Sequence, residues 1–158
     1  MNEILPDTQT RLEKRYRVTA FVVLAQIVFS IALIPVAWFL AANTENAVTQ
    51  TSLTSLWVAV LFIALATFVL RRALFRWERL KDIVLLKGID GLLAALQVNA
   101  IILGAMAEII AIFGFLIAVL GGVKYDMFRA AVVALVVFLI NFPRKSIWEK
   151  VVANLQSI

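Results

Sequence analysis

The chain has 158 residues, of which 63% are hydrophobic and 16% are charged, and its mean hydropathy is +0.98. A soluble domain is usually about half apolar and about a quarter charged, so this composition indicates an integral membrane protein. The absence of cysteine and histidine excludes disulfides and thiolate metal sites, and it removes the side chain best suited to proton transfer near neutral pH.

The chain begins with a basic arm that leads into a long apolar run. Residues 7–17 predict a short segment at the membrane surface, and residues 18–42 predict the first span. This run is longer than the apolar region of a cleavable signal peptide, which has about 7–15 residues, so we expect a spanning helix. Pro35 lies near its far end, where a kink is tolerated if neighbouring helices cover the freed carbonyl.

The second span is predicted at residues 56–75, after a loop at residues 43–55 whose one charged residue is Glu45. Basic residues mark the inner end of this span, where long side chains can extend toward the headgroups. Residues 76–88 then mix charged and apolar side chains, which predicts an amphipathic segment in the plane of the interface. A solvated helical loop is the alternative for this segment.

The third span is predicted at residues 91–120, with Asp90 as its N-cap. At a rise of about 1.5 Å per residue it is roughly 45 Å long, which exceeds the hydrocarbon core of about 30 Å, so we expect it to tilt or project. A tight turn at residues 122–127 leads to the fourth span, at residues 128–142. Residues 146–156 predict a short interfacial helix with an apolar side.

The distribution of charge predicts the orientation. Of the 15 Lys and Arg residues, all but Lys124 and Arg129 lie in the N-terminal arm, in residues 71–87 or in the C-terminal tail. The positive-inside rule therefore places both termini in the cytoplasm and predicts a multi-pass protein of the inner (cytoplasmic) membrane. The net charge of +5 then indicates contact with anionic lipid headgroups rather than nucleic acid. The candidate headgroup contacts are Arg71, Arg72, Arg76, Arg144 and Lys145.

Small residues recur along the third span with alternating spacings of four and three. This seam consists of Ala100, Gly104, Ala107, Ala111, Gly114, Ala118 and Gly121. Helices in membranes associate by close packing, and small residues let two backbones approach. We expect the seam to face another helix, in the same chain or in a neighbouring copy.

Glu108 lies beside the seam, near the middle of the third span. An unpaired carboxylate at that depth costs about 2.5–3.5 kcal/mol on insertion scales, so we expect it to be protonated or paired. It is a candidate ion or proton carrier, with Gln97 as a second polar group on the same helix; a neutral, hydrogen-bonded structural acid is the alternative. The candidate partners within the chain are Gln26, Ser30, Thr67, Gln97 and Asn141.

Two resemblances bear on this region. Residues 107–120 (AEIIAIFGFLIAVL) resemble the carboxylate-bearing helix of the rotary ATPase c subunit, the proteolipid. That resemblance implies an ion-carrying role for Glu108. The second half of the chain also resembles a group of uncharacterised small four-span bacterial proteins, through Glu108, Phe113-Gly114, Gly121-Gly122, Phe142-Pro143-Arg144 and Trp148-Glu149. This second resemblance implies no activity.

The sequence thus predicts an all-α protein with four spans, and two functions for it. The first is a packing or accessory subunit of a homo-oligomer or a larger membrane complex, held through the seam. The alternative is a proton- or sodium-translocating component that uses Glu108. Acid–base catalysis normally needs paired groups with separated pKa values, so we expect neither an enzyme nor a cofactor.

Overall fold

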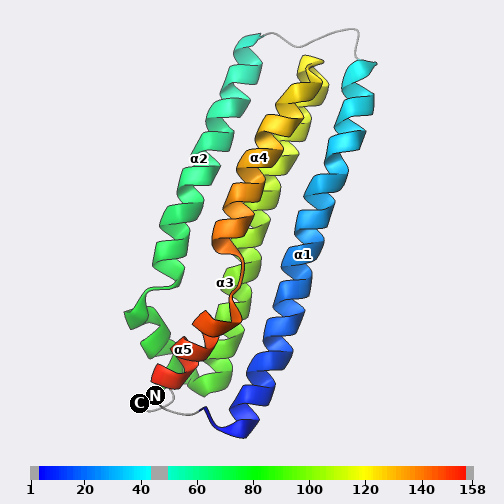
Figure 1. Ribbon diagram of the computed structural model, residues 1–158. Coiled ribbons are helices and arrows are strands. Elements are labelled where there is room, and N and C mark those ends of the chain that lie inside the picture. Colours follow the sequence, from blue (N-terminus) through cyan, green and yellow to red (C-terminus); the bar gives the residue numbers. More distant parts are fainter. Residues whose placement is uncertain (1–3, 44–49, 156–158) are drawn as a thin grey trace.

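The computed structural model describes residues 4–43 and 50–155, which form five helices and no strand. The helices are α1 (Pro6–Ala42), α2 (Gln50–Leu74), α3 (Trp77–Gly121), α4 (Lys124–Asn141) and α5 (Lys145–Leu155). Four long helices run side by side, and the short α5 lies at the end of the bundle where α1 begins (Figure 1). We call this end the basal end. The predicted all-α class is confirmed.

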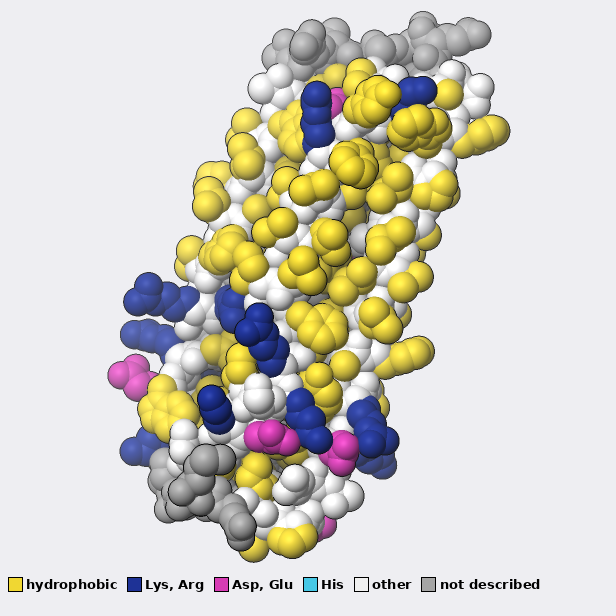
Figure 2. Space-filling model, viewed as in Figure 1, with side chains coloured by type: hydrophobic (Ala, Val, Ile, Leu, Met, Phe, Trp, Pro, Cys, Tyr) yellow, Lys and Arg dark blue, Asp and Glu magenta, His cyan; other side chains and the backbone are white. Residues whose placement is uncertain are grey.

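Four stretches of the described chain are helical, long and apolar enough to cross a membrane. They are α1, residues Ser52–Leu74 of α2, α3, and the stretch Lys124–Leu155 that contains α4 and α5. Apolar side chains cover the upper part of the face in Figure 2, whereas basic side chains gather toward the basal end. Four helices of this kind are typical of a multi-pass membrane protein.

Helix α3 lies at the centre of the bundle and contacts each of the other helices. In its most apolar 18-residue window, 44% of the residues are buried, compared with 17% in α1 and 11% in α2. Large apolar side chains of α1 and α2 consequently face outward, as expected for helices that meet lipid on one side.

Three helix boundaries differ from the predicted ones. Helix α1 is continuous from Pro6 to Ala42, so the predicted surface segment and the first span are one helix. Pro6 occupies the first turn, where its missing N–H is tolerated. Helix α2 begins at Gln50, inside the predicted loop. Helix α4 begins at Lys124 because Gly122, with a φ of 65°, ends α3 in the left-handed region that favours glycine.

The predicted amphipathic segment is the first part of α3, set off by a break at Gly88. This glycine has φ 66° and ψ −170°. A Cβ added there would meet no atom within 4 Å, so glycine suits this position because of its backbone conformation and not because of lack of space. Leu80 of this segment is buried, whereas Leu86 is 82% exposed. Asp90, the predicted N-cap, instead lies within α3 and pairs with Arg11 of α1, with Nη1 and Oδ2 2.8 Å apart.

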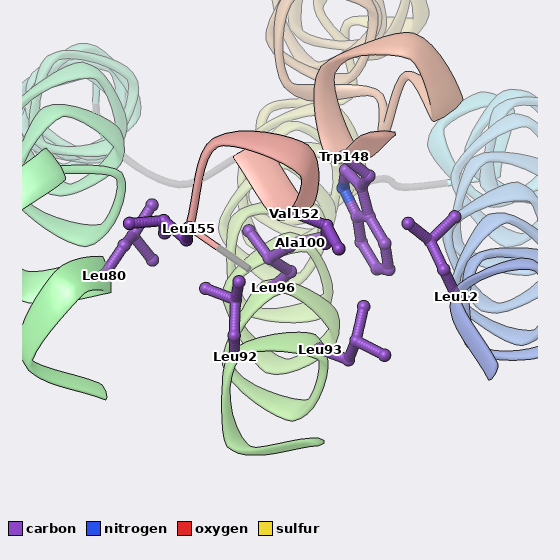
Figure 3. Close-up of a cluster of buried hydrophobic side chains, with 9 residues drawn as sticks. All are labelled: Leu12, Leu80, Leu92, Leu93, Leu96, Ala100, Trp148, Val152 and Leu155. Atoms are coloured by element: carbon purple, nitrogen blue, oxygen red, sulfur yellow. The ribbon is translucent and has the colours of Figure 1, made fainter. Parts of the chain in front are cut away.

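Helix α5 buries its apolar side in the protein. Trp148, Val152 and Leu155 are at most 2% exposed and belong to a cluster with residues of α1 and α3 (Figure 3). Trp148 points from α5 toward Leu12 of α1, and its ring meets that of Tyr16 edge to face at 5.9 Å. The helix predicted to be interfacial thus caps the basal end of the bundle, with its apolar side covered by the chain itself.

Asn99 joins α3 to α2 through a backbone hydrogen bond. Its side chain is buried, and Nδ2 donates to the carbonyl oxygen of Leu74 at 3.1 Å. The last four carbonyls of a helix have no partner within the helix, so Asn99 satisfies one at the end of α2.

We expect Asn99→Leu to lower the free energy of unfolding by about 1–3 kcal/mol, because the Leu74 carbonyl loses its donor. Unfolding in mixed detergent micelles, followed by circular dichroism, measures this loss. Val98→Leu, an apolar change at the exposed neighbouring position, is the control. Equal stability of the two variants would contradict the assigned role.

Candidate functional site

The seam of small residues faces the inside of the bundle. Six of its seven residues are buried, and Gly121 is partly buried. A Cβ added at Gly114 would overlap Ala130 of α4, one at Gly104 would overlap the side-chain oxygen of Gln26 of α1, and one at Gly121 would approach Leu53 of α2. The chain's own helices thus occupy the seam. An oligomer therefore needs a different contact surface.

Glu108 is partly buried on the flank of α3 that faces α1. Gly104, one turn earlier on this flank, packs against Gln26. Phe115, two turns later, packs in a cluster with Ala37 of α1. The carboxylate of Glu108 forms no hydrogen bond or ion pair with residues 4–43 or 50–155. The expected polar partner is thus not found within the described chain.

The candidate partners of Glu108 are engaged differently. Thr67 Oγ1 donates to the carbonyl of Ile63 at 2.7 Å, and Asn141 Nδ2 donates to the carbonyl of Val137 at 2.8 Å. Gln26 Oε1 and Ser30 Oγ are buried and have no hydrogen-bond partner in the described part of the chain. The two residues lie one turn apart on α1. Within the described chain, Gln26 Oε1 is thus a buried acceptor without a donor, and the Ser30 hydroxyl, which can donate and accept, is unpaired.

Gln97 is not brought together with Glu108. The two residues are 11 positions apart on α3, which corresponds to roughly 16 Å along the helix axis. Its Oε1 instead accepts a hydrogen bond from Arg15 Nη1 at 3.3 Å. Arg15 and Gln97 line a groove of about 310 Å³ between α1 and α3, together with Lys14 and Asp90. Gln97 therefore belongs to the basic surface of the basal end.

The five residues predicted to contact lipid headgroups lie in different surroundings. Arg71 and Arg144 line one cavity at the basal end. Arg72 and Arg76 are exposed outside it.

Lys145, the fifth predicted headgroup residue, forms ion pairs instead. Its Nζ lies 3.6 Å from Glu13 of α1 and 3.8 Å from Glu149 of its own helix. A hydrogen bond from Arg17 and the nearby charge of Lys145 lower the pKa of Glu13. The pair between Lys145 and Glu13 therefore links α5 to α1, although such an exposed pair contributes little stability.

The end opposite to α5 carries an aromatic and charged cluster. Trp38 and Tyr125 meet edge to face at 5.8 Å, and Lys124 Nζ lies 4.6 Å from the centre of the Trp38 ring. Arg129 Nη1 pairs with Asp126 Oδ1 at 3.0 Å. The sequence places these aromatic residues near a span end, but it carries no signal for their contact.

Within the described residues, no group of three acidic side chains is placed to hold a metal ion.

No protein-family model, curated protein or solved structure matches this chain. The resemblance of residues 107–120 to the proteolipid helix therefore stays a prediction. The bundle itself offers three features that bear on function: a buried seam, a partly buried carboxylate and a basic basal end.

Proposed function

We propose that the chain is an accessory subunit of a homo-oligomer or a larger assembly in the inner membrane, with its basal end in the cytoplasm. The positive-inside rule supports this orientation, because most basic residues lie toward the basal end. The observation that carries the assembly proposal is the exposed apolar groove between α2 and α3.

This groove has a volume of about 580 Å³ and an apolar lining. Phe62 and Val69, at 74% and 72% exposed, stand on its α2 side, and Met106 lines its α3 side. Ala66 and Ala73 also line it, seven residues apart on α2, and small residues of this kind let a second helix approach closely. Because the seam of α3 is filled from within, we assign the assembly contact to this groove.

Native mass spectrometry of the protein in mild detergent tests the proposal. We expect the wild type to run as a defined oligomer or a larger complex. Ala66→Phe should shift it toward the monomer, because the larger side chain fills the groove. Ala32→Phe, the same change at an exposed position of α1, is the control and should leave the mass unchanged. A wild type that is monomeric under the mildest conditions would refute the assembly proposal.

A second candidate function is proton or sodium translocation through Glu108. Its support is the position of this carboxylate in the apolar part of α3, on the flank that faces α1, where Gln26 packs against Gly104 and holds a buried oxygen without a donor in the described chain. A protonated carboxyl group is a donor, so it complements such acceptors. Intramembrane carboxylates of this kind often mark ion pathways.

Glu108→Gln separates the two candidates. The amide has nearly the same shape as the carboxyl group, so an accessory subunit should keep its mass and change its free energy of unfolding by less than about 0.5 kcal/mol. This is the result we expect. Ion flux into proteoliposomes, driven by a pH or sodium gradient, is the second measurement, with Glu149→Gln at the basal end as the charge-matched control. Flux in the wild type that only Glu108→Gln abolishes would establish translocation instead.

A further inference from the structure

A cavity of about 160 Å³ lies at the basal end, where α2 and α4 end and α5 begins. Its volume is several times the share of one water molecule in the liquid, which is about 30 Å³. Arg71 of α2, Asn141 of α4 and Arg144 before α5 provide polar side chains, and Trp148 closes one wall. The cavity thus combines a charged lining with a position at the end of the apolar helices.

The two guanidinium groups carry charge that the described part of the chain does not neutralise. Neither Arg71 nor Arg144 forms an ion pair with the described residues, and no carboxylate lines the cavity. Arg71 Nη1 donates to the carbonyl oxygen of Ile140 at 2.8 Å, which holds this side chain against the end of α4. Since a guanidinium has five N–H groups, Arg71 retains donors for a ligand.

Asn141 adds an unsatisfied acceptor to the same cavity. Its Nδ2 is used within α4, whereas its buried Oδ1 accepts no hydrogen bond from the described chain. A buried acceptor without a donor costs free energy, so a ligand that donates a hydrogen bond there is favoured. The first turn of α5 borders the cavity and contributes partial positive charge from its backbone amides.

We infer that this cavity binds the headgroup of an anionic glycerophospholipid that carries a hydroxyl group, such as phosphatidylglycerol. The phosphodiester accepts hydrogen bonds from Arg71 and Arg144. A headgroup hydroxyl donates to Asn141 Oδ1 after a rotation of the Asn141 side chain exposes this oxygen, which is buried in the unliganded chain. An ethanolamine headgroup also has donors, but its ammonium group is repelled by two unneutralised guanidinium groups. The inference rests on the proposal that the bundle spans a membrane, and it does not depend on the assembly contact.

The test is binding of short-chain lipids to the full-length protein in mild detergent, measured by native mass spectrometry and by the shift in melting temperature. Phosphatidylglycerol should bind more tightly than phosphatidylmethanol, which has the same charge but no headgroup hydroxyl, and more tightly than phosphatidylethanolamine. Arg144→Gln should weaken binding of phosphatidylglycerol by roughly tenfold or more, because a charge-assisted hydrogen bond is lost. Asn141→Ala should abolish the preference for phosphatidylglycerol over phosphatidylmethanol.

Arg72→Gln is the matched control, because it removes the same charge from an exposed position outside the cavity; we expect less than a roughly twofold effect. An equal loss in the two arginine variants would overturn the site in favour of general attraction between charges. Equal binding of the three lipids by the wild type would also overturn it, as would binding of inorganic phosphate but not of lipid. Failure of the membrane proposal itself would give a different result: the wild-type protein would stay soluble without detergent.

Discussion

Replacing Trp148 by alanine is expected to detach α5 from the bundle and to lower the free energy of unfolding by about 3–5 kcal/mol. The indole is only 2% exposed, and it fills the space between α5, α1 and α3. The edge-to-face contact with Tyr16 is lost with it. Trp148 is the largest of the three α5 side chains that pack into this cluster, so its loss leaves α5 held mainly by Val152 and Leu155, and we expect this helix to become sensitive to protease before the rest of the bundle unfolds.

Trp77→Ala is the matched control for this prediction. Trp77 is 46% exposed at the start of α3, so the same truncation there removes much less buried surface. Chemical unfolding in mixed micelles and limited proteolysis of both variants measure the two effects. Similar losses in the two variants would show that α5 is not held by its tryptophan.

The second large effect is expected at Gly114, where alanine should cost about 1–3 kcal/mol of unfolding free energy. Its new Cβ would overlap the Cβ of Ala130, which is attached directly to the backbone of α4 and cannot rotate away. Relief therefore requires α3 and α4 to move apart, and this loosens the contacts around the seam.

Gly104→Ala provides an informative comparison, because it makes the same change in the same seam. There the new methyl group meets the end of the Gln26 side chain, which can adopt another rotamer. We therefore expect Gly104→Ala to cost less than half as much as Gly114→Ala. Thermal unfolding followed by circular dichroism compares the two variants. A larger loss for Gly104→Ala would contradict the packing that we describe.

Local patterns in the sequence account for the helical class and for the central position of α3. Long apolar runs require helices, because backbone polar groups in a membrane must be satisfied within the segment. The small residues at Ala107, Ala111 and Gly114 share one face of α3 through their spacing alone, and that face is buried. The pair Gly121-Gly122 likewise marks the end of α3, where Gly122 adopts a positive φ.

The partners of these faces were decided by the tertiary structure. The sequence left open whether the seam meets the same chain or another copy, because the spacing of small residues is the same in both cases. Only the fold shows that Gly114 meets Ala130 and that Trp148 meets α1. It also brings Arg71 to the same cavity as Arg144, 73 positions further along the chain. Periodicity reports which side of a helix is apolar or small, whereas contacts between distant segments depend on how whole helices pack, and no local pattern encodes that.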